Sequence, residues 1–101
     1  MMPPHVNRIE PADGEVLQED VITVHGYTLR YADEEPVLVD VESGAPVAIT
    51  SELEQTRHDR GTGLPGSVQY SGVLTIRATG LQSGRTYRLT YLDEVATFTK
   101  A

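Results

Sequence analysis

The chain contains no cysteine and no tryptophan, and aromatic residues make up only 6% of it. Without cysteine the domain has no disulfide, no thiolate nucleophile and no sulfur-ligated metal, and the redox state of its compartment stays open. The hydrophobic fraction of 39% lies below the usual range of about 45–50% for globular domains. The core must therefore be built mainly from Val, Leu and Ile.

Positive charge and long apolar runs are also scarce. The net charge is −7 and the sequence pI is about 4.7, so the domain repels phosphate backbones and nucleic acid is not an expected partner. No segment approaches the roughly 18 consecutive apolar residues of a membrane span, so no membrane partner is expected either. The N-terminus lacks a basic region followed by an apolar stretch, which predicts either a cytoplasmic protein or a domain excised from a larger, exported one.

A length of 101 residues fits one domain spanning 1–101. Apolar residues alternate with polar ones in short runs that turn signals separate every ten or so residues, and this pattern predicts about seven strands. The expected strands are 6–10, 21–29, 37–42, a strand beginning at 47, 73–79, 87–92 and 95–99. These strands predict an all-β, immunoglobulin-like Greek-key β-sandwich, with an up-and-down barrel as the alternative.

Several positions define the expected strands more closely. Val16-Leu17 continues the edge of the first strand after a kink at Pro11, and Gly26 marks a β-bulge in the second strand. Val37, Val39 and Val41 alternate with Leu38, Asp40 and Glu42. We expect Val39 in the interior together with Ile76 and Leu89. The first strand and the strand after Ser43 are the expected sheet edges, through which self-association is possible.

Residues 51–71 permit two interpretations. The strand that begins at Val47 extends through Leu53, or Ser51 caps a short helix with Glu54 three residues later as a capping box. Residues 59–66 are rich in glycine and are expected to form a loop.

Leu81-Gln82-Ser83-Gly84-Arg85-Thr86-Tyr87 has the pattern of a tyrosine corner. In this arrangement a Tyr at the start of a strand bonds through its hydroxyl to backbone a few residues upstream and fixes a crossover between two sheets. Leu81, Gly84 and Tyr87 are therefore assigned a structural role.

Three segments resemble the immunoglobulin-like superfamily in its bacterial and fibronectin type III-like forms. The segment 9–17 is similar to the opening of bacterial Ig-like and copper-resistance-type modules, and Gly26-Tyr27-Thr28-Leu29 resembles the IPT/TIG subgroup. The corner at 81–91 is similar to the fibronectin type. The absence of tryptophan distinguishes the chain from antibody domains, which pack a Trp against a disulfide. The resemblance implies a spacer, an adhesin-type repeat or a docking unit.

The copper-resistance resemblance implies a metal site, for which His5, His25 and His58 are the candidate ligands for Cu(II) or Zn(II). The chain departs from that pattern, because His5 follows four other residues and no Met-rich loop is present. Carboxylates at 33–35 and at Asp93-Glu94 are expected at the same end of the sandwich, where they form a candidate Ca²⁺ site. The competing interpretation of both sets is solvated side chains, and no cofactor is predicted.

The strongest candidate binding site is the basic loop Arg57, His58, Asp59 and Arg60, with Tyr70 as an aromatic anchor for an acidic partner. Nucleophilic catalysis has little support, because no Gly-x-Ser-x-Gly elbow follows a strand. The sequence therefore predicts a non-catalytic module for protein–protein interaction or structural spacing. The alternative is a small metal-binding β-sandwich.

Overall fold

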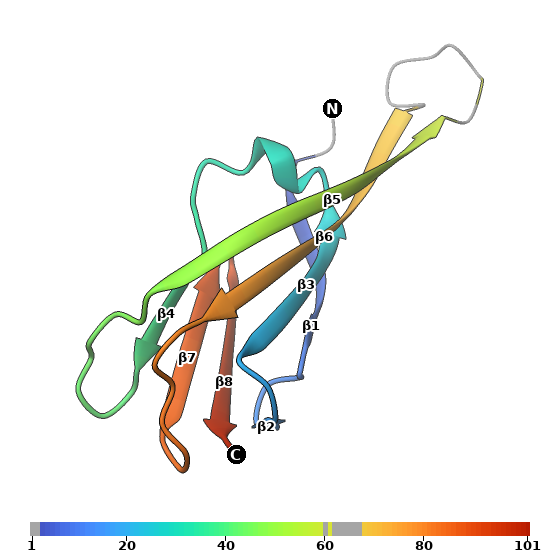
Figure 1. The fold of residues 1–101 in the computed structure, drawn as a ribbon. Helices are drawn as coiled ribbons and strands as arrows, with labels where there is room; N and C mark the ends of the chain where they lie inside the picture. Colours follow the sequence, from blue (N-terminus) through green and yellow to red (C-terminus); the bar gives the residue numbers. More distant parts are fainter. Residues whose placement is uncertain (1–2, 60, 62–67) are drawn as a thin grey trace.

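The computed structural model describes residues 3–59, 61 and 68–101, and it is all-β apart from one short 3₁₀ turn, η1 (Leu29–Tyr31). One sheet has the order β1-β3-β6-β5 and the other the order β2-β8-β7-β4 (Figure 1). The described strands are β1 (His5–Glu10), β2 (Val16–Leu17), β3 (Val21–Tyr27), β4 (Val37–Asp40), β5 (Ile49–Asp59), β6 (Val68–Ala78), β7 (Thr86–Tyr91) and β8 (Glu94–Lys100). The predicted β-sandwich is confirmed, with eight described strands where about seven were expected.

The core lies between the two sheets and is largely aliphatic, as the composition predicts. Alternate residues of each strand point into it, so that β3 buries Ile22 and Val24 and leaves Thr23 and His25 on the outer face. Ile76 and Leu89 are fully buried, as expected. The largest fully buried side chains are Phe98, Leu17, Ile22, Leu38, Ile76, Leu89 and Val24.

β2 corrects the prediction that Val16-Leu17 continues the first edge. After Pro11 the chain crosses to the other sheet, where β2 pairs in parallel with β8. The Gly14 N–H donates to the Thr97 carbonyl, and the Ala101 N–H donates to the Leu17 carbonyl. In this position Leu17 is completely buried. If Val16-Leu17 continued the edge of β1 instead, the Leu17 side chain would gain less burial.

The predicted bulge at Gly26 is also misplaced. Gly26 pairs regularly with Gly72, and the register shift lies on the opposite strand, between Val6 and Arg8 of β1. Gly26 is glycine for a different reason: a Cβ there would collide with the backbone carbonyl oxygen of His5. The residue allows β1 to approach β3 closely.

β4 has the opposite phase to the one that its valines suggest. Leu38 and Asp40 face inward, Val37 and Val41 are exposed, and Val39 is only half-buried. The expectation of an interior Val39 is therefore wrong, because Val39 lies on the face of β4 opposite to Leu38 and does not pack against the core. Asp40 tolerates its inward position because three hydrogen-bond donors surround its carboxylate.

β5 shows that strand extension is right for residues 51–59 and that the short helix at Ser51 is wrong; residues 60 and 62–67 lie outside the described residues. β5 and β6 pair without a break from Ile49↔Ala78 to Asp59↔Val68. Their far ends extend beyond the rest of the sandwich (Figure 1), past the row in which Thr56 and Ser71 align with Tyr27. This projecting part has no opposing sheet, so backbone pairing rather than core burial holds it.

The tyrosine corner is present. The Gln82 N–H donates to the Tyr87 hydroxyl over 2.9 Å, and Tyr87 is only 3% exposed. A tight hairpin joins β7 and β8, and its first loop residue, Leu92, has a φ of 54°. The corner carries the chain from β6 in one sheet to β7 in the other, and the hairpin then adds β8 beside β7 in the same sheet.

Candidate functional site

The predicted basic loop is not a loop over its first three residues. Arg57, His58 and Asp59 belong to β5, and Tyr70 belongs to β6, directly opposite Arg57. Because side chains alternate along a strand, Arg57 and Tyr70 lie on one face of the hairpin and His58 lies on the other. The structure therefore divides the predicted cluster between two faces; Arg60 lies outside the described residues.

His58 instead meets a serine on the outer face. Its Nε2 lies 2.7 Å from the Ser71 hydroxyl, and His58 is exposed. A serine nucleophile needs its base oriented by a third group and an enclosed site with an oxyanion hole. An exposed pair on the face of a sheet offers neither feature.

The three candidate histidine ligands lie on three different strands: His5 on β1, His25 on β3 and His58 on β5. Within residues 3–59, 61 and 68–101, no group of three or more His, Cys, Asp or Glu side chains is placed to hold a metal ion. His25 Nε2 lies 3.4 Å from a Glu10 carboxylate oxygen, which is a pair and not a ligand set.

The acidic loops do meet at one end of the sandwich, as expected. Asp33 and Glu34 line a hollow of about 290 Å³ together with Leu92 and Asp93. These described carboxylates are not grouped closely enough to hold a metal ion. This end of the sandwich therefore presents an acidic surface rather than a formed Ca²⁺ site.

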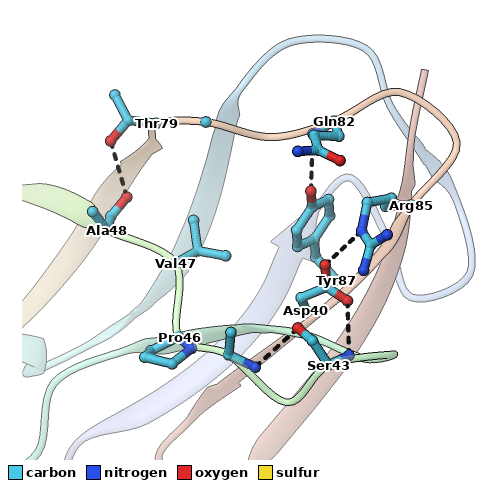
Figure 2. Close-up of a pocket in the computed structure, with 11 residues that line it drawn as sticks. Asp40, Ser43, Pro46, Val47, Ala48, Thr79, Gln82, Arg85 and Tyr87 are labelled. Atoms are coloured by element: carbon cyan, nitrogen blue, oxygen red, sulfur yellow. Dashed lines mark hydrogen bonds and ion pairs between the residues drawn. The ribbon is translucent and has the colours of Figure 1, made fainter.

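A hollow of about 420 Å³ lies between the β4–β5 connection and the tyrosine corner (Figure 2). At its floor the Arg85 Nε donates to Asp40 Oδ2 over 2.6 Å, and Arg85 Nη1 lies 3.2 Å from a Glu42 carboxylate oxygen. Asp40 Oδ1 also accepts the backbone N–H groups of Glu42 and Ser43. These polar groups already satisfy one another, so the hollow braces the corner and is poorly suited to bind a ligand.

Sequence reasoning missed the Asp40–Arg85 ion pair. The hydrogen bond from Arg85 is the main reason that the pKa of Asp40 lies below the usual 3.8, and the N–H groups of Ser43 and Glu42 lower it further against an opposing effect of burial. Asp40 fits the outward positions of the alternating run at 37–41, so the available signal was only the arginine inside the corner turn.

Replacing Asp40 with asparagine should flatten the acid side of the stability profile. A lowered pKa in the folded state means that the unfolded chain binds more protons, so the contribution of Asp40 is fully present above pH 3.8 and is lost as the pH falls through the lowered pKa. Urea unfolding of both proteins from pH 7 to pH 2 measures this difference. If the difference in free energy of unfolding between the parent and Asp40→Asn stayed constant down to pH 2, the lowered pKa of Asp40 would be wrong. Asp33→Asn, on an exposed loop, is the matched control.

The outer edge of β5, which is an edge strand of its sheet, carries backbone groups that pair with no neighbouring strand. The Thr79 N–H donates to the Ala48 carbonyl, so Ala48 faces β6. Backbone groups of an antiparallel strand alternate between its two sides, which directs those of Ile49, Ser51, Leu53 and Gln55 away from β6 and toward the open edge. No backbone hydrogen bond from another described segment reaches these four residues.

Comparison of the chain with protein families, curated proteins and solved structures found no match. Among the described residues, no helix has the length and apolar character needed to cross a bilayer. Function is therefore inferred from the geometry of the sandwich alone.

Proposed function

We propose that the chain is a non-catalytic, immunoglobulin-like module that mediates protein–protein contact or spaces neighbouring domains. The strand orders β1-β3-β6-β5 and β8-β7-β4 correspond to the two sheets of an immunoglobulin domain, with β2 as an added edge strand. This correspondence and the tyrosine corner support the immunoglobulin-like assignment.

The observation that carries the proposal is the β5–β6 hairpin. It projects beyond the sandwich and presents an eleven-residue edge strand without a proline or a bulge (Figure 1). Natural sheets normally blunt such an edge, because its free N–H and C=O groups pair readily with another chain. An open edge on a projecting arm is suited to contact with another protein.

Site-specific photo-crosslinking in the source cell tests the proposal. A benzophenone side chain placed at exposed positions on β5, β4 and β8 (Thr50, Val37 and Val95) should form adducts with a protein partner from β5 and not from all three sites. If no position gives an adduct with a second protein or a neighbouring domain, a contact-making role is wrong. A rise in melting temperature with Cu(II), Zn(II) or Ca²⁺ would instead support the metal-binding alternative.

A further inference from the structure

The edge of β5 differs from the other three sheet edges. β1 is interrupted by its bulge and followed by Pro11, and β2 has only two residues. β4 has four residues, and its own connection to β5 covers it through bonds from Val47 N–H to the Leu38 carbonyl and from Asp40 N–H to the Ala45 carbonyl. Among the described edge strands, only β5 has a long edge that no bulge interrupts and no other described segment covers.

The side chains along this edge have a clear two-sided pattern. Glu52 and Glu54 lie exposed on the outer face, and neither forms an ion pair with a described residue. On the inner face, Ile49 and Leu53 are half-buried and pack against the core. A strand laid beside β5 would place its alternate side chains next to these two sets.

We infer that residues 49–55 of β5 accept an extended segment of a partner protein as an added strand, with basic side chains facing Glu52 and Glu54 and apolar side chains beside Ile49 and Leu53. The inference rests on the proposed function and specifies its contact. The open backbone groups of Ile49, Ser51, Leu53 and Gln55 would form the ladder, and the two carboxylates would select a basic segment.

Charge argues against a second copy of this chain as the occupant. Each chain has a net charge of −7, so two copies repel. Antiparallel self-pairing centred on Leu53 would also place Glu52 of one copy directly opposite Glu54 of the other, and like charges in that position are destabilising. The same two carboxylates that repel a second copy attract a lysine- or arginine-bearing strand.

A synthetic peptide of eight residues in which lysine alternates with valine, blocked at both ends, tests the inference on the ¹⁵N-labelled protein. We expect amide hydrogen exchange to slow at Ile49, Ser51, Leu53 and Gln55, whose N–H groups face the open edge. The same peptide with glutamate in place of lysine, and a lysine peptide N-methylated along one edge, should not protect these amides.

Two variants separate charge from backbone. E52Q/E54Q should weaken peptide binding about three- to tenfold at low salt, whereas E15Q/E94Q, which removes two exposed carboxylates elsewhere, should leave it unchanged. Ser51→Pro removes one open N–H without removing a bond to β6, and it should abolish protection of the edge while the domain stays folded. If Ser51→Pro does not fold, the comparison of E52Q/E54Q with E15Q/E94Q and the N-methylated peptide still test the inference.

The inference is overturned if the lysine peptide leaves the four amides unprotected, if E52Q/E54Q binds it as tightly as E15Q/E94Q does, or if the protein alone dimerises through this edge. Photo-crosslinks to a partner from β4 or β8 would then leave the proposed function standing while the β5 site fails. Absence of adducts from every position would contradict the proposed function itself.

Discussion

Gly26→Ala will lower the free energy of unfolding by about 3 kcal/mol, at the upper end of the usual effect of overpacking. The added methyl group would collide with the His5 carbonyl oxygen and would lie 3.0 Å from a Leu29 methyl group. The first of these atoms is backbone, so it can move only if β1 separates from β3. Equilibrium urea unfolding at pH 7 measures the loss.

The natural control is the glycine directly opposite. Gly72 pairs with Gly26 across β3 and β6, but the nearest atom to a methyl group added at Gly72 would be a Leu53 side-chain methyl at 3.3 Å. A flexible side chain can shift, so Gly72→Ala should cost about 1 kcal/mol or less. Equal losses for the two variants would contradict the explanation from close strand approach.

Tyr87→Phe is expected to cost about 1–3 kcal/mol, because the Gln82 N–H loses its acceptor at the corner. The ring remains in place and the core loses no volume, so the effect reports the hydrogen bond. Chemical denaturation of the parent and the variant measures it.

Tyr91→Phe is the matched control for this prediction. Tyr91 lies on the same strand and is equally buried at 3%, but its hydroxyl makes no hydrogen bond within the described residues. Its replacement should change stability by less than about 0.5 kcal/mol. A Tyr87 variant as stable as the Tyr91 variant would remove the structural role assigned to the corner.

The sequence predicted the parts of the fold that local chemistry determines. A glycine turn followed by Tyr87 marked the corner, and alternation marked the last strand at 95–99, which is β8. The first strand and the strand after Ser43 were correctly predicted as edges. In each case the local sequence pattern matches the burial or the turn that the residues have in the structure.

The wrong predictions concern segments whose orientation or sheet depends on residues far away in the sequence. Nothing in Val37, Val39 and Val41 reveals that Arg85, 45 residues after Asp40, would stabilise an inward carboxylate and reverse the phase of β4. Val16-Leu17 is too short for its sheet to be assigned from periodicity, and its partner is the last strand. The projecting part of β5 and β6 carries no apolar alternation because no core faces it, so sequence reasoning misread residues 57–59 as loop.

The same lack of burial has an evolutionary consequence. Substitutions in the outer rungs of the hairpin remove no packing from between the sheets, so selection for folding constrains them weakly. Related domains should therefore differ most in these outer rungs, whereas residues 49–55, where Ile49 and Leu53 pack against the core, should vary less.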